Sequence, residues 1–249
     1  MLPQTNLQLY QLMIQGGSDV ESLMRVRAAY DAARQLFASS FRPSHKPFLC
    51  HLVGTGGALA SWGQPVDMTI AGLLHSVFLY GQFGDGAKGA APQRRDWLRR
   101  IVGVDAEALV YAYTQSRWNH WTAVTLMEAI ENDLPLRQAT TIKLADLLDE
   151  FSDNGPQYSP AKPLEFRLHE GIAAQEDFLA LVSHCVGLRA KEQFRETFAT
   201  LTDFHVPDCL RNGDRSFHVQ ETGVPELVRS PLGRTISRLQ RRLFPSRAA

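Results

Sequence analysis

Two histidines and one aspartate lie in apolar segments of this 249-residue chain. His51 follows "KPFLC", His75 lies within "AGLLHSVFLY", and Asp146 lies within "IKLADLLDE". Each segment has helical periodicity, so neighbouring antiparallel helices would bring the three side chains together. Imidazole nitrogens and a carboxylate oxygen are ligands for borderline divalent ions. The pattern predicts one metal site with open coordination positions, suited to Mn, Fe or Zn. For each residue taken alone, the alternative is a side chain that is simply packed in the core.

Helices dominate the expected secondary structure. The segment "SDVESLMRVRAAYDAARQLF" has Ser18 and Glu21 at the spacing of a capping box and predicts a helix over 19–38. Further helical windows are 49–62, 66–80, 93–102, 105–116, 120–131, 135–151, 164–186 and 190–203. No segment shows sustained alternation with hairpin turns. The expected fold is therefore all-α, an antiparallel helical bundle in which the windows 49–62, 66–80 and 135–151 are neighbours.

Breakers and charge divide the chain into three predicted parts. The loop "SDNGPQYSPAKP" ends a helical domain at 1–155, and 156–225 forms a helical and irregular extension. Residues 226–249 have no acidic residue after Glu226 and read as a basic amphipathic C-terminal helix. Such a helix either docks on the core or contacts an anionic surface.

Composition argues for an ordinary globular protein. Lys+Arg and Asp+Glu both number 26, so no global charge favours nucleic acid. The three cysteines have no CxxC pairing, which favours a reducing, cytoplasmic setting. No apolar run approaches the length of a transmembrane segment, so we expect none.

The order of the motifs resembles the HD-domain superfamily, and within it the hydrolase domain of RelA/SpoT-type alarmone enzymes. "FRPSHKPFLCH", "AGLLHS", "LRRIVGVDAEALVYAYTQ" and "IKLADLLDE" follow that family's arginine and histidine, "LLHD", "FG-x-x-V-x-x-L-V" and "KLADR" motifs over residues 25–155. The resemblance implies an HD-domain-like bundle and makes His51, His75 and Asp146 the metal ligands. It also places Arg42, and with it Ser44 and Lys46, where the family contacts a nucleotide. The alternative for Arg42 is a surface arginine that pairs with a helix end.

Two departures from the family alter the expected chemistry. Ser76 stands where the family has the aspartate of its "HD" motif, and Leu79 and Tyr80 stand where it has an acidic pair that positions and deprotonates water. Asp85, in the glycine-rich loop after the His75 helix, is an alternative source of a carboxylate. We expect Ser76 to face the metal without acting as a strong ligand.

The favoured function is a metal-dependent phosphohydrolase that acts on a nucleotide or another small phosphorylated or anionic molecule. Two further classes stay open. One is a non-haem iron oxygenase on an HD-like scaffold, because two histidines and one carboxylate suit Fe(II). The other is a non-catalytic ligand-binding protein with a degenerate site. Metal analysis and oxygen dependence separate the three.

Overall fold

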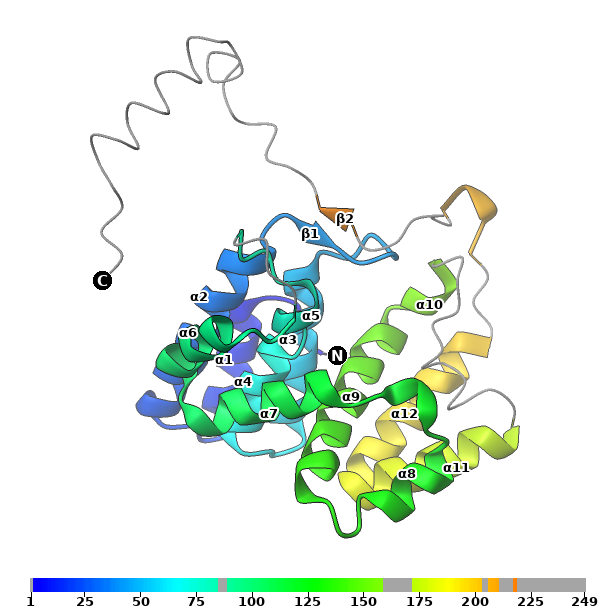
Figure 1. Ribbon diagram of the computed structural model, residues 1–249. Coiled ribbons are helices and arrows are strands. Elements are labelled where there is room, and N and C mark those ends of the chain that lie inside the picture. Colours follow the sequence, from blue (N-terminus) through cyan, green and yellow to red (C-terminus); the bar gives the residue numbers. More distant parts are fainter. Residues whose placement is uncertain (1, 85–88, 159–171, 203–205, 211–216, 219–249) are drawn as a thin grey trace, which may run out of the picture. The chain divides into compact units, whose positions relative to one another are not determined.

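Helices form nearly all of the regular structure in a computed structural model of the chain, which confirms the all-α class (Figure 1). The structure describes residues 2–84, 89–158, 172–202, 206–210 and 217–218. The α-helices are α1 (Asn6–Gln15), α2 (Val20–Phe37), α3 (Phe48–Ser61), α4 (Val66–Leu74), α5 (Val77–Tyr80), α6 (Pro92–Val102), α7 (Val104–Gln115), α8 (Ala123–Ala129), α9 (Leu134–Ser152), α10 (Gly155–Tyr158), α11 (Ile172–Cys185) and α12 (Leu188–Thr202). Short 3-10 helices lie at η1 (Trp118–His120) and η3 (Asp208–Leu210), and two-residue strands at β1 (Ser40–Phe41) and β2 (Phe217–His218).

The centre of the bundle is formed by α3, α4 and α9, which contact one another as the three windows predicted. In Figure 1 the cyan α3 and α4 lie beside the green α9. Glycines allow α3 and α4 to approach closely: a Cβ at Gly72 would lie 2.6 Å from a Leu59 methyl carbon, and 3.1 Å from the backbone of Gly56. Helix α7 packs on α4 and α9, and α2 packs on α3 and α4. The central helices are therefore buried from several sides, which explains their continuous apolar sequences.

The last described helices belong to the same compact unit as the bundle, which spans Met1–Phe217. Helix α11 packs on α8, α9 and α12, and α12 also packs on α9. Phenylalanines join these helices, with ring centroids 5.4 Å apart for Phe151 and Phe198 and 5.1 Å apart for Phe178 and Phe194. His218–Ala249 form a second unit. The basic helix expected at 226–249 lies outside the described residues.

Several local expectations differ from the structure. Helix α1 was not predicted, and the window 66–80 is interrupted at His75 and Ser76, between α4 and α5. The predicted capping box is wrong by one residue, because Asp19 is the N-cap of α2 and accepts a hydrogen bond from the Ser22 amide. The window 120–131 is helical mainly in α8, and η1 overlaps it only at His120. Residues 164–171 of the predicted window 164–186 lie outside the described residues.

None of the described helices is long and apolar enough to cross a bilayer. All three cysteines, Cys50, Cys185 and Cys209, are free thiols.

Candidate metal centre

The structure brings His51, His75 and Asp146 together in the interior. His51 lies in the first turn of α3, His75 is the C-cap of α4, and Asp146 lies in the middle of α9. Their exposed fractions are 0%, 1% and 5%. Three elements that pack on one another thus each contribute one buried ligand.

The three facing atoms have the spacing of ligands on a single ion. His51 Nε2 lies 3.3 Å from His75 Nε2 and 3.2 Å from Asp146 Oδ1, and His75 Nε2 lies 3.8 Å from the same carboxylate oxygen. A triangle with these sides has a point about 2.0 Å from all three corners, which is the length of a Zn–N or Zn–O bond. The residues therefore fit a divalent cation without rearrangement of their facing atoms.

Hydrogen bonding determines which nitrogen of His75 faces the centre. His75 Nδ1 lies 2.8 Å from the Gly72 carbonyl oxygen, and a carbonyl can only accept, so Nδ1 carries the proton. Burial, outweighing the attraction of Asp146, lowers the pKa of His75 to about 3. The ring is therefore neutral at physiological pH and presents the Nε2 lone pair to the centre.

His51 is fixed in the same tautomer by partners on both sides of its ring. Its Nδ1 lies 2.8 Å from Asp149 Oδ2, and its Nε2 lies 3.0 Å from an amino nitrogen of Arg42. Because a guanidinium only donates, Nε2 must accept and the proton must be on Nδ1. Two imidazole lone pairs and a carboxylate oxygen consequently converge on one buried point.

Asp146 is oriented through its second oxygen. Oδ2 accepts hydrogen bonds from the Tyr113 hydroxyl at 2.9 Å and from Lys143 Nζ at 2.7 Å, which leaves Oδ1 facing the imidazoles. Burial alone would raise the pKa of Asp146, but the Lys143 ammonium outweighs it and holds that pKa well below its usual range. The ligand is therefore ionised.

A tight turn before α3 carries the predicted anion-binding residues. The Arg42 amide donates to the Lys46 carbonyl at 2.9 Å, and His45 takes a left-handed conformation with φ of 64°. Arg42 pairs with Glu150, near the end of α9, and its side chain is only 19% exposed. Arg42 therefore does pair with a helix end, but it is not a surface residue. Ser44 lies half-buried in the turn and, among the described residues, makes no side-chain hydrogen bond.

Lys46 contacts the same end of α9 as Arg42 does. Its Nζ lies 2.8 Å from Asp149 Oδ2 and 2.8 Å from Asp153 Oδ2. The turn thus sets two cations against the acidic C-terminal part of α9, with Arg42 beside the ligand atoms and Lys46 behind His51.

Four residues of the centre were missed by sequence reasoning. They are Tyr113, Lys143, Asp149 and Glu150. Three of them stand three or four positions from Asp146 on the same helix, so helical spacing could have found them. Tyr113 comes from α7 and carries no comparable local signal.

The positions that depart from the HD pattern provide no carboxylate. Ser76 is buried directly after His75, whereas Leu79 and Tyr80 are 49% and 52% exposed. Asp85 lies outside the described residues. Among the described residues, the candidate group of metal ligands is His51, His75 and Asp146.

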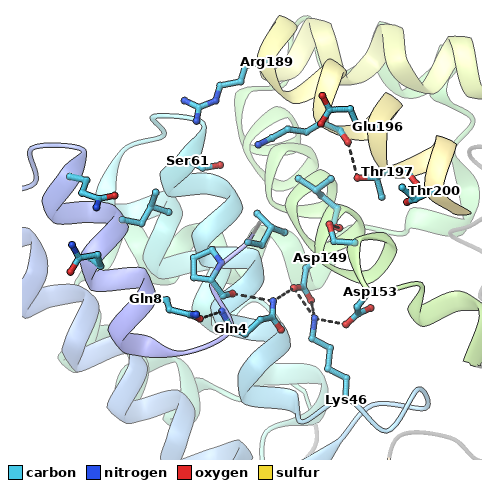
Figure 2. Close-up of a pocket in the computed structure, with 18 of the residues that line it drawn as sticks. Gln4, Gln8, Lys46, Ser61, Asp149, Asp153, Arg189, Glu196, Thr197 and Thr200 are labelled. Carbon is cyan, nitrogen blue, oxygen red and sulfur yellow. Dashed lines mark hydrogen bonds and ion pairs between the residues drawn. The ribbon is translucent and has the colours of Figure 1, made fainter.

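A separate cleft of about 1040 Å³ lies between α1, α9 and α12 (Figure 2). Its wall includes Gln4, Lys46, Asp149 and Asp153, and the hydrogen bonds among them are drawn in Figure 2. Asp149 also contacts His51, so its carboxylate stands between this cleft and the metal ligands.

A family model described as a domain of unknown function (DUF6817) matches residues 33–117. The matched range holds Arg42, both candidate histidine ligands and Tyr113, and it ends before α9. No curated protein matches the chain.

Proposed function

We propose that this chain is an HD-type, metal-dependent phosphohydrolase that acts on a nucleotide or another small phosphoester. The observation that carries the proposal is the convergence of three buried ligand atoms, separated by 3.2, 3.3 and 3.8 Å, beside the guanidinium of Arg42. The proposed cofactor is one Mn, Fe or Zn ion. The free cysteines fit the cytoplasmic setting that belongs to this proposal.

A divalent ion at this point would polarise a phosphoryl group and acidify the attacking water. Tyr113 and Lys143 hold Asp146 in the ionised, inward-facing form that such an ion requires. Arg42 supplies a planar donor beside the ligands, and a guanidinium is well matched to phosphate oxygens. If the His51 lone pair held an ion, the amino group of Arg42 that donates to it would become available to the substrate.

The missing carboxylates limit the rate that we expect. Leu79 and Tyr80 cannot accept a proton from water at neutral pH, and Ser76 adds no charge. Turnover should therefore be slower than in a complete HD site, where an acidic group removes that proton.

Charge balance favours a second candidate, a non-catalytic ligand-binding protein. Each carboxylate around the centre already has a cationic partner: Asp146 has Lys143, and Asp149 has Lys46. Glu150 is likewise paired with Arg42. A divalent ion would add charge that only an incoming anion could offset, so binding of a phosphorylated molecule without hydrolysis is the alternative. A non-haem iron oxygenase shares the same ligand set.

The deciding experiment uses the full chain purified without a histidine tag. Metal-free protein is titrated calorimetrically with Mn²⁺, Fe²⁺ and Zn²⁺, and the loaded protein is then assayed for phosphate release from nucleotides and phosphoesters, with and without oxygen. His75→Ala is the variant without a site, and Arg34→Ala is a surface control. Stoichiometric metal with phosphate release supports the hydrolase. Failure of all three ions to bind overturns the metal centre, and bound metal without release supports the binding protein.

A further inference from the structure

Asp149 lies one helical turn beyond Asp146 and is fully buried. Its Oδ2 contacts His51 Nδ1 at 2.8 Å and Lys46 Nζ at 2.8 Å. Its Oδ1 accepts from Lys46 Nζ at 2.9 Å and from Gln4 Nε2 at 3.1 Å (Figure 2). The orientation of the Gln4 amide is independently fixed, because the same Nε2 donates to the Pro3 carbonyl at 3.1 Å. Every group around this carboxylate is therefore a hydrogen-bond donor or can act as one.

The backbone of α3 is shaped to admit this carboxylate. A Cβ at Gly54 would lie 1.8 Å from Asp149 Oδ1 and 3.1 Å from Gln4 Nε2, so no side chain fits at position 54. Gly54 follows His51 by almost one turn of the same helix. The glycine that admits Asp149 thus lies beside the imidazole that Asp149 contacts.

We propose that Asp149 is a positioning residue, which holds the proton of His51 on Nδ1 and so reserves Nε2 as the ligand atom. The inference rests on the proposed metal function for its purpose, although the tautomer itself can be measured without a metal. A ring nitrogen that faces a carboxylate donates to it, and a histidine ligand whose other nitrogen donates to a carboxylate has its ring orientation fixed as well. Lys46 and Gln4 in turn hold the carboxylate in place.

Asp149→Asn gives the sharpest test because it keeps the volume but removes one acceptor. Lys46 and Gln4 both need the single remaining oxygen, so the amide NH₂ turns to His51 Nδ1. The ring must then accept at Nδ1 and carry its proton on Nε2, where Asp146 Oδ1 lies 3.2 Å away to receive it, and the Arg42 amino group 3.0 Å from Nε2 must turn away. A protonated Nε2 cannot bind a cation. An exchange of aspartate for asparagine produces such a wrong tautomer in the serine-protease triad.

Long-range proton–nitrogen NMR of the metal-free full chain at neutral pH reads the tautomer directly. We expect the His51 proton on Nδ1 in the wild type and on Nε2 in Asp149→Asn. Asp153→Asn is the matched control, because Asp153 binds the other side of Lys46 at 2.8 Å and does not contact His51. This control should keep the wild-type tautomer. Gly54→Ala, which displaces the carboxylate without changing it, should disturb the His51 signals while the fold is monitored by circular dichroism.

Metal titration of the same samples completes the test. We expect Asp149→Asn to weaken Mn²⁺ or Zn²⁺ binding about 10–100-fold, the usual loss when a residue that hydrogen-bonds to a metal ligand is replaced. Asp153→Asn should leave the affinity nearly unchanged. Any other protonation state of His51 in the wild type, or an unchanged tautomer in Asp149→Asn, overturns the role of Asp149. Absence of metal binding in the wild type, with the tautomers as expected, overturns the proposed function alone.

Discussion

Replacement of Arg42 by alanine tests whether the guanidinium is a structural part of the centre as well as a ligand-binding group. The change removes the ion-pair partner of Glu150, whose side chain is 9% exposed, while the Arg42 side chain itself is 19% exposed. Loss of one partner of a buried pair costs about 3–5 kcal/mol. Partial exposure reduces this, so we expect the free energy of unfolding to fall by about 2–3 kcal/mol. For a chain of this size that corresponds to a decrease in Tm of roughly 4–12 °C.

The measurement is thermal and urea unfolding of metal-free protein, with two comparisons. Arg34→Ala removes an arginine that is 62% exposed and pairs with Asp31 at 3.6 Å, and it should cost less than about 0.5 kcal/mol. Glu150→Gln in the Arg42→Ala background removes the orphaned charge and should recover part of the loss. A loss below about 1 kcal/mol in Arg42→Ala, or no recovery in the double variant, would refute the reasoning. The ion pair between Arg42 and Glu150 would then contribute as little to stability as an exposed pair.

Further outcomes can be measured on the same protein. Ser76→Asp adds a carboxylate next to His75 at a position only 3% exposed, so it should lower the Tm of metal-free protein. The same change should strengthen Mn²⁺ binding in calorimetry, and weaker binding would contradict the charge argument. Gly72→Ala should cost about 1–3 kcal/mol by overpacking α3 against α4, whereas Gly16→Ala, whose Cβ would meet nothing closer than 3.4 Å, should cost little in urea unfolding. Folding lowers the pKa of His75 from 6.5 to about 3, so the unfolded chain binds a proton before the folded chain does. Metal-free protein should therefore lose stability as the pH falls from about 6.5 towards 3. His75→Gln should flatten this dependence of stability on pH, and an unchanged slope would contradict the pKa argument. Phosphate and Mn²⁺ should bind cooperatively, because the charge of each ion offsets that of the other. An Mn²⁺ affinity that is equal with and without phosphate would exclude this cooperativity.

The central helices were predictable from sequence to within a residue or so because their apolar runs are long and clearly bounded. The break at His75 and Ser76 was not, since apolar periodicity continues through it. Helix α1 was missed because its apolar face is narrow, with Leu9 and Met13 as its buried residues. In both cases tertiary packing determines a helix boundary or a helix that the local sequence pattern does not specify.

The candidate site was also predictable only in part. His51, His75 and Asp146 lie together as expected, whereas metal binding by them stays a prediction. The role of Asp149 depends on Gly54 and on a glutamine near the N-terminus, and no spacing rule connects these positions. The burial of Arg42 depends on the conformation of the turn at His45, which the residue types do not specify.

The Gln4–Asp149 hydrogen bond also has a consequence for folding kinetics. It joins residues 145 positions apart, and Lys46 and His51 reach Asp149 across 103 and 98 positions. Contacts of such long sequence separation close large loops and form late, after the entropy of those loops has been lost. A cation that recognises only the assembled site would therefore bind after the rate-limiting barrier of folding. It should slow unfolding and leave the folding rate almost unchanged.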